Sequence, residues 1–205
     1  MLHGQHLSSI VLRTNKRNEL TFSKKLSQVN TLITILLILA GIIALLLIIA
    51  LFMKKEHYVN REIIINAPRQ KVFDFLKLLK NQDQFNKWAT ADKKNRKEEF
   101  KGTDGTVGFI YSWSGDKSAG RGEKEIKNII EGKRIETEIR FVKPMRVAAS
   151  VIFETESLSD DQTKVNLINT GTLKYPLNIM IPMAEKRFPK DMDESLSTLK
   201  NILEK

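Results

Sequence analysis

The 205-residue chain contains no cysteine and only three histidines. The lack of thiols excludes disulfides, cysteine nucleophiles and thiolate metal sites, and it leaves the redox compartment unassigned. His3 and His6 lie in an N-terminal head, and His57 lies just after a long apolar run. We therefore expect a globular body without a histidine, and hence no histidine general base and no histidine metal site. No metal ion or other cofactor is predicted.

Charge is missing from a second part of the chain. No charged residue occurs from Leu26 to Met53, and the most apolar part is Thr31–Met53. A helix over residues 31–53 would be about 34 Å long at ~1.5 Å per residue, against a bilayer core of about 30 Å. The run exceeds the ~7–15 residue core of a cleavable signal peptide, and no small-x-small cleavage site ends it. It therefore predicts a single-pass membrane protein, and the nearly balanced flanking positive charges assign no side.

The apolar run divides the chain into four parts. We expect a basic flexible tail over residues 1–30, a transmembrane helix over 31–53, a short linker over 54–57 and one domain over 58–205. Basic residues exceed acidic ones by ten in the whole chain and only mildly in the body. This balance favours an anionic membrane surface as a partner. Nucleic acid is not expected, because the body has no basic helix and no aromatic stacking motif; no protein partner is assigned.

The body has an α+β pattern. Residues 58–65 read as a strand, and apolar spacing predicts an amphipathic helix around residues 72–79 and a short helical segment over 81–88. From about residue 97 to 175, alternating apolar residues and turn signals predict some five strands of an antiparallel sheet. Pro182 is expected to break any helix over 177–186. A final helix starting near Pro189 carries one apolar stripe, formed by Met192, Leu196, Leu199 and Leu203.

Several short motifs recur in a known order. They are IIINAPRQKVF over residues 63–73, Gly105-Thr106-Val107-Gly108, Trp113, Gly120-Arg121-Gly122-Glu123, Lys133-Arg134-Ile135 and Lys143-Pro144. In this order they resemble the polyketide cyclase/dehydrase-type members of the START-like SRPBCC superfamily, which includes the birch-pollen-allergen-like proteins. The resemblance covers about residues 58–205. It implies an α+β helix-grip fold, in which a curved antiparallel sheet wraps on a long C-terminal helix.

The resemblance also implies a cavity between the sheet and the last helix. Members of the superfamily bind lipids, hormones or other apolar molecules, and only some are enzymes, without a shared catalytic set. The candidate lining residues in this sequence are Trp88, Tyr111, Trp113, Phe141, Met145, Tyr175, Met180, Met183, Phe188 and Met192. Aromatic and methionine side chains suit apolar ligands of irregular shape. The alternative is that these side chains simply fill a close-packed core.

Carboxylates are the remaining candidates for chemistry. Pairs two residues apart, such as Glu123 and Glu125 or Glu136 and Glu138, share one face of a strand. The simpler interpretation is a solvated charged face interleaved with Lys and Arg. Glu123 is the best catalytic candidate, because the preceding Gly120 and Gly122 could open space beside it. A single carboxylate is weak evidence for an enzyme.

Three hypotheses follow. The favoured one is a membrane-anchored protein that binds a lipid or other hydrophobic small molecule between the sheet and the C-terminal helix. The second is an enzyme of the polyketide cyclase or dehydrase kind that uses Glu123. The third is a membrane-tethered interaction module, similar to the chaperone-regulating branch of the superfamily.

Overall fold

The structure is a computed structural model that describes residues 3–90, 96–115, 120–143 and 145–205. Side chains are not described for residues 3–24, 26, 27 and 90. The chain forms two compact units, residues 1–51 and 52–205, and each is described here by itself. We call the second unit the body.

The first unit is one helix, α1 (His3–Phe52). The predicted flexible tail over residues 1–30 therefore differs from the structure, in which the helix begins at His3. The physical reason is that no proline precedes Pro68, and each further helical residue adds one backbone hydrogen bond once a helix has formed. Residues Gln28–Phe52 are long and apolar enough to cross a membrane, a property that a signal sequence near an N-terminus shares.

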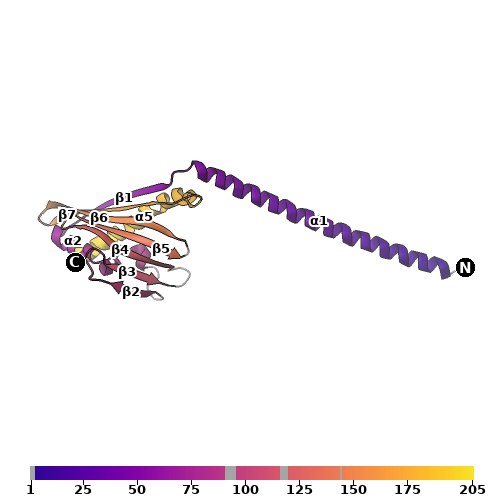
Figure 1. Ribbon diagram of the computed structural model, residues 1–205, viewed down its shortest axis with the longest axis horizontal. Helices are drawn as coiled ribbons and strands as arrows, with labels where there is room; N and C mark the ends of the chain where they lie inside the picture. The colour runs from indigo at the N-terminus through magenta and orange to yellow at the C-terminus, as the bar shows by residue number, and fades with distance from the viewer. Residues whose placement is uncertain (1–2, 91–95, 116–119, 144) are drawn as a thin grey trace. The chain divides into compact units, whose positions relative to one another are not determined.

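The body is built on a seven-stranded sheet with the order β1-β7-β6-β5-β4-β3-β2 (Figure 1). All neighbouring strands pair antiparallel. The strands are β1 (Glu56–Ile65), β2 (Lys97–Lys101), β3 (Ile110–Ser114), β4 (Arg121–Ile130), β5 (Arg134–Lys143), β6 (Val147–Ser159) and β7 (Gln162–Thr172). Residues 97–175 thus hold six strands, one more than the five or so predicted there, and the strand predicted over residues 58–65 is β1. In the predicted Val107–Trp113 alternation, Val107 precedes β3 and is exposed, while Tyr111 and Trp113 are buried.

The strand β1 begins two residues earlier than predicted, so the linker is shorter than residues 54–57. This corrects the expectation of a body without histidine, because His57 is part of the sheet and is buried. The pairing of Glu56 with Thr172 and of His57 with Gly171 extends the ladder to the start of the strand. Sequence alternation alone gave no reason to extend a strand into a charged segment.

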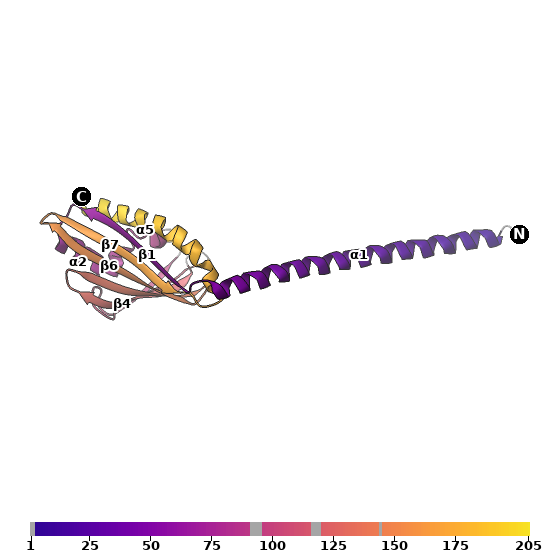
Figure 2. The same ribbon diagram turned by 90° about the horizontal axis from the view of Figure 1, so that it is seen from above.

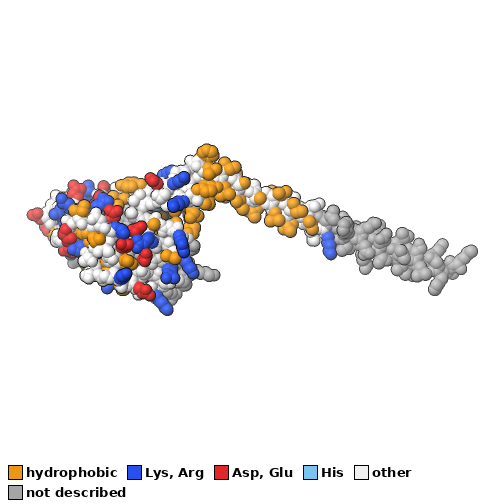
Figure 3. All heavy atoms as spheres, viewed as in Figure 1, with side chains coloured by type: hydrophobic (Ala, Val, Ile, Leu, Met, Phe, Trp, Pro, Cys, Tyr) orange, Lys and Arg blue, Asp and Glu red, His pale blue; other side chains and the backbone are white. Residues whose placement is uncertain are grey.

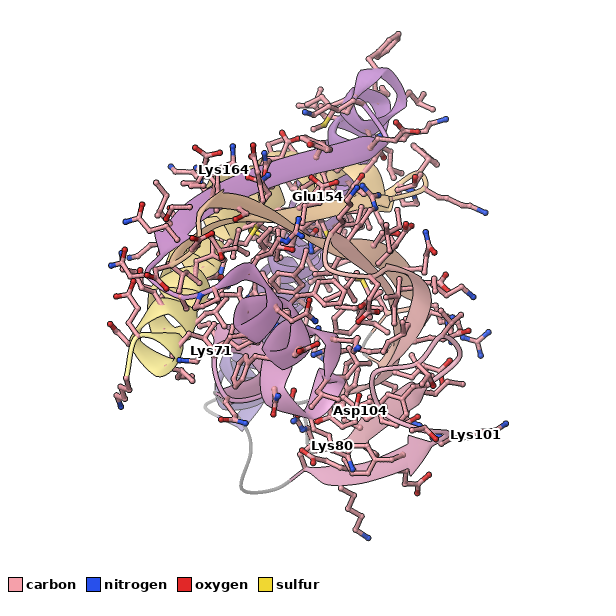
Figure 4. The ribbon with its side chains drawn as sticks, turned by 90° about the vertical axis from the view of Figure 1, so that its left-hand side faces the viewer. Lys71, Lys80, Lys101, Asp104, Glu154 and Lys164 are labelled. Atoms are coloured by element: carbon pink, nitrogen blue, oxygen red, sulfur yellow. The ribbon has the colours of Figure 1, made fainter. Side chains whose placement is uncertain are left out.

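Three short helices follow β1: α2 (Arg69–Lys77), α3 (Leu79–Gln82) and α4 (Lys87–Thr90). The start of α3 is fixed by Asp104 of the β2–β3 turn, whose carboxylate accepts hydrogen bonds from the backbone N–H groups of Leu79 and Lys80 at 2.8 and 3.2 Å. Figure 4 labels Asp104 and Lys80, which lie close together in that view. A carboxylate in this position satisfies N–H groups that lack a helical partner.

The C-terminal helix α5 (Ile181–Leu203) is preceded by a 3₁₀ turn, η2 (Leu177–Met180). The helix is continuous, which corrects the prediction of a break at Pro182 and a new start near Pro189. Pro182 lies in the first turn, where its missing N–H would have no partner anyway. Pro189 lies inside the helix, which curves along the sheet (Figure 2).

The apolar stripe of α5 packs against the concave side of the sheet, which we call the inner face. The four residues predicted for the stripe are at most 3 % exposed and belong to the main core. Their partners in that core include Val59, Ile65, Phe153 and Leu167 from three strands. Every residue of both core clusters lies between Val59 and Leu203, so the body holds its complete core.

Candidate functional site

The candidate site is the inner face of the sheet between its two edges. The sheet pairing places one row of residues across six strands, namely Tyr111, Lys124, Ile139, Ala149, Gly171 and His57. Ala149 and Gly171, in the second half of this row, are small. The polar side chains of Lys124 and His57 lie toward the two ends of the row.

Close approach of large rings explains two glycines of this face. A Cβ on Gly171 would lie 2.8 Å from Cε1 of His57, and a Cβ on Gly122 would lie 2.6 Å from Cζ2 of Trp113. Real Cβ atoms do not approach neighbours so closely, so only glycine leaves room for each ring at this position. Gly120 and Gly122 were expected to open space beside Glu123, and at Gly122 the ring of Trp113 occupies that space.

An ionic cluster lies at the β2–β4 end of this face. Arg96, just before β2, contacts Asp83 of the α3–α4 turn at 2.8 Å and Glu98 of β2 at 2.8 Å. The hydroxyl of Tyr111 donates to Glu98 at 2.9 Å and also contacts Arg96. Lys124 completes the cluster, with Nζ 3.7 Å from Oδ1 of Asp83. Two cations thus face two carboxylates, so the cluster has no net charge.

Burial controls protonation in this cluster. The side chain of Lys124 is 8 % exposed. Desolvation lowers its pKa below the usual lysine value, against the opposing attraction of Asp83. Desolvation also raises the pKa of Tyr111, and the nearby carboxylates of Asp83 and Glu98 raise it further. The phenol therefore stays protonated and acts as a donor.

Four buried polar atoms of this region have no hydrogen-bond partner among the described residues. They are Nζ of Lys124, Oδ1 of Asp83, Oγ1 of Thr137 and Nδ1 of His57. Lys124, Thr137 and His57 all point from the inner face, because they occupy the buried positions of their strands. Buried polar groups are nearly always paired, so unpaired ones on one face indicate a place for water or a ligand.

At the β1 end of the site, the aromatic rings of His57, Phe188 and Trp88 pack against one another in series. His57 bonds Asn169 of β7 through Nε2 at 2.8 Å, and its ring packs edge-on against Phe188 of α5 at 5.6 Å. Phe188 in turn packs edge-on against Trp88 of α4 at 5.5 Å. The indole N–H of Trp88 donates to Asp191 of α5 at 3.1 Å. These contacts hold α4 against α5.

The predicted lining residues fall into three groups. Tyr111, Trp113 and Phe141 form a continuous aromatic wall on the inner face, with ring centroids 6.2 and 5.6 Å apart. Trp88 and Phe188 lie together as described, and Met192 is buried in the main core. Of the remaining predicted residues, Met145 lies between β5 and β6. Tyr175 and Met180 precede α5, and Met183 lies in its first turn. Tyr175 and Met183 are exposed.

Glu123, the catalytic candidate, lies on the opposite, outer face. Its carboxylate pairs with Arg140 at 2.8 Å, and the same guanidinium contacts Glu125 at 2.7 Å and also Glu138. These hydrogen bonds lower the pKa of Glu125. The carboxylate ladder is therefore an ionic surface centred on an arginine, and Glu123 points away from the inner face.

Sequence reasoning missed the polar residues of the site. Lys124 lies between Gly122 and Ile126, so strict alternation on β4 would have placed it inside. Asn169 likewise continues the inner face of Val165 and Leu167. Asp83 and Arg96 lie in irregular segments and carried no periodic signal.

The described residues also form a surface hollow of about 480 Å³ at the far end of the sheet. It is lined by Arg69, Ile130, Lys133, Arg134, Glu154, Thr155, Glu156 and Ser157. Arg134 already pairs with Glu154 and Glu136 there. This hollow lies away from the aromatic wall and the unpaired polar atoms, so we do not assign the site to it.

Comparisons with known proteins bear on the fold. No family model matches the sequence, and no curated protein matches it. Among solved structures, the chain resembles a hypothetical protein from Helicobacter pylori, with 11 % identity, a TM-score of 0.53 and coverage of 72 % of this chain and 88 % of that one. It also resembles Ara h 8.0201, with 15 % identity, a TM-score of 0.52 and coverage of 72 % and 97 %.

A third similar structure is a protein from Nitrosospira multiformis, with 15 % identity, a TM-score of 0.51 and coverage of 72 % of this chain and 96 % of that one. Identities this low establish the fold alone. The sheet, its antiparallel order and the closing α5 together make the body an α+β helix-grip fold.

Proposed function

We propose that the body binds a mostly apolar small molecule, such as a lipid, between the inner face of the sheet and α5, and that the chain is anchored to a membrane. The observation that carries the binding proposal is a set of buried polar atoms without a hydrogen bond at Thr137 and His57, together with Nζ of Lys124, whose ion-pair partner Oδ1 of Asp83 lies 3.7 Å away. An unpaired buried polar group costs about 1–3 kcal/mol. A hydroxyl or carbonyl group of a ligand would satisfy the atoms at one end of this face; His57 lies on β1, four strands from Lys124 on β4, so its Nδ1 needs a separate polar group.

The rest of the inner face suits an apolar ligand. The aromatic wall of Tyr111, Trp113 and Phe141 lies beside Lys124, the direct strand partner of Tyr111, and Met192 belongs to the core formed by α5 and the sheet. Binding sites for small molecules combine such apolar walls with a few placed polar groups. The neutral sum of charges in the Lys124 cluster favours a ligand with an uncharged polar group over one with a strong net charge.

Native mass spectrometry tests this proposal. The body, residues 54–205, is purified from its own host, checked for a cooperative thermal transition, and analysed before and after solvent extraction. We expect an added mass that extraction removes and that an apolar small molecule accounts for. Lys124→Met and Thr137→Val should each reduce its occupancy. Lys127→Met, the same substitution at an exposed lysine of the same strand, should not.

Membrane anchoring needs a separate test. The apolar segment Gln28–Phe52 of α1 supports it by length and composition. Membranes from cells that express the full chain are washed with alkaline carbonate, and the mass of the retained protein is measured. An anchored chain stays in the pellet at full length. A protein shortened to residues near the start of the body would instead identify the segment as a cleaved signal sequence.

A further inference from the structure

The body has two different ends. Strands β1, β4 and β6 start, and strands β3, β5 and β7 finish, at the end where the chain comes from α1, and α5 also begins there. We call this the linker end. Residues 53–55 are fixed against it within the body: the backbone carbonyl of Met53 accepts from Asn178 at 3.1 Å, and that of Lys55 accepts from Leu173 at 2.8 Å.

Exposed basic side chains gather at the linker end. Those described there are Lys54, Lys55, Arg121, Lys143, Arg146, Lys174, Lys186 and Arg187. The acidic side chains described there are Glu56 and Glu185, and Glu185 is already paired with Lys54 at 2.6 Å. In Figure 3, blue side chains correspondingly gather along the edge of the body near the start of β1.

Most of these cations form no ion pair with the part of the chain that the structure describes. Lys54 pairs with Glu185, and Arg187 pairs with Asp191 at 3.3 Å. The other six basic residues of the linker end make no ion pair with any described residue. Their charge is therefore available to an outside anion.

The opposite end has no such excess. Its loops include the acidic pair Asp160 and Asp161, and several of its lysines and arginines pair with carboxylates. Lys77 pairs with Glu131 and Lys164 with Glu156, both at 2.8 Å. Figure 4, which looks onto this end, shows labelled groups of both signs spread over it. The basic surface is thus a property of one end and not of the body as a whole.

Several apolar side chains are exposed among the cations of the linker end, including Phe141 and Val142 beside Lys143. Tyr175 is 43 % exposed and directly follows Lys174, and Met183 is 61 % exposed. Met183 lies three and four residues before Lys186 and Arg187, so all three share one face of α5. Amphipathic rings and flexible apolar groups beside lysines are typical of surfaces that contact a membrane interface.

We propose that the linker end is a docking surface for an anionic phospholipid bilayer, with the free cations at headgroup phosphates and Tyr175 and Met183 at the interface. The proposal rests on the membrane anchoring proposed above. Residues Met53–Lys55 connect α1 to the linker end of the body. A tether raises the effective concentration of the membrane, so weak individual contacts suffice. In the docked body, the start of α5 would face the bilayer, which is the source of a lipid ligand.

The test supplies the tether artificially, so it does not depend on the role of α1. The body carries a histidine tag before Lys54 and is bound to vesicles that contain a nickel-chelating lipid. Because the chain has no cysteine, Met183→Cys can be labelled alone with a polarity-sensitive dye. Asp160→Cys, at the opposite end, is the matched control. The remaining lipid is phosphatidylcholine, with or without phosphatidylglycerol.

We expect the dye at residue 183 to shift to the blue when phosphatidylglycerol is present, and the dye at residue 160 to stay unchanged. Neutralising Lys174 or Lys186 in the untagged body should lower its partitioning onto the anionic vesicles about fivefold each, the factor that corresponds to about 1 kcal/mol per basic residue. Lys133→Gln, at the far end, should leave partitioning unchanged. Equal emission at residue 183 on both vesicles, or equal shifts at residues 183 and 160, would overturn the proposal.

Discussion

The imidazole of His57 closely approaches the backbone of Gly171, with Cε1 2.8 Å from the position that a Cβ on that glycine would take. The two residues are direct partners in the β1–β7 ladder. This contact joins the first strand of the body to the small-residue part of the inner face. It makes the packing at this point sensitive to a single methyl group.

Gly171→Ala should destabilise the body by about 1–3 kcal/mol, the usual effect of overpacking. The added methyl group would meet the ring of His57 and, at 3.1 Å, the carbonyl oxygen of Ala148. Chemical denaturation measures the change in the free energy of unfolding. Combining it with His57→Ala should recover part of the loss, because the ring is the nearest obstacle. Strictly additive losses would contradict the contact.

Lys124 should give the body a distinctive pH dependence. Burial lowers its pKa in the folded state below the unfolded value, so the unfolded chain binds more protons in the window below about pH 10.4. Stability from this group therefore rises as the pH rises through that window. In Lys124→Met this rise is missing, so the stability of the variant relative to the wild type should fall as the pH rises from the folded-state pKa of Lys124 to that value.

Denaturation curves at several pH values measure this difference, and the other titrating groups largely cancel in it. Lys127→Met is the control, since Lys127 is 46 % exposed. A pH-independent difference for Lys124→Met would show that the ammonium is solvated.

The stripe on α5 should carry much of the stability of the body. Leu196 is 1 % exposed and packs in the main core, so Leu196→Ala should cost about 2–5 kcal/mol. Met183, on the same helix, is exposed, so Met183→Ala should change stability by no more than about 0.5 kcal/mol. Thermal or chemical unfolding measures both. Similar losses in the two variants would be inconsistent with the orientation of α5.

Asp104 should act as the cap of α3. Its carboxylate accepts from the N–H groups of Leu79, Lys80 and Gly105. Asp104→Ala should therefore destabilise the body by about 1 kcal/mol, the usual loss for a cap. Asp161→Ala, in the exposed β6–β7 turn, is the matched control and should be nearly neutral. Faster amide exchange at Leu79 and Lys80 in Asp104→Ala would locate the effect.

Much of the fold could be predicted because its signals are local. The period of two in β5 and the stripe of Met192, Leu196, Leu199 and Leu203 each follow from side chains that must share one buried face. The boundaries were less predictable. Proline is tolerated in a first helical turn, and packing against the sheet holds α5 together across Pro189, so the sequence breakpoints at Pro182 and Pro189 did not end the helix.

The candidate site was only partly predictable. The aromatic wall was found because Tyr111 and Trp113 alternate on one strand. Lys124 was not predicted on the inner face, because its charged neighbours Glu123 and Glu125 make the segment resemble a solvent-facing strand. The contact of Asp83 with Arg96 spans two irregular segments, and only the tertiary fold brings them together.

The claim that the inner face holds a ligand is tested most directly by a crystal structure of the natively purified body at a resolution that resolves water. The proposal predicts continuous density for an apolar molecule beside Tyr111 and Trp113, with a polar group within hydrogen-bonding distance of Lys124 or Thr137. Density explained entirely by protein side chains and by isolated waters on those polar atoms would contradict it.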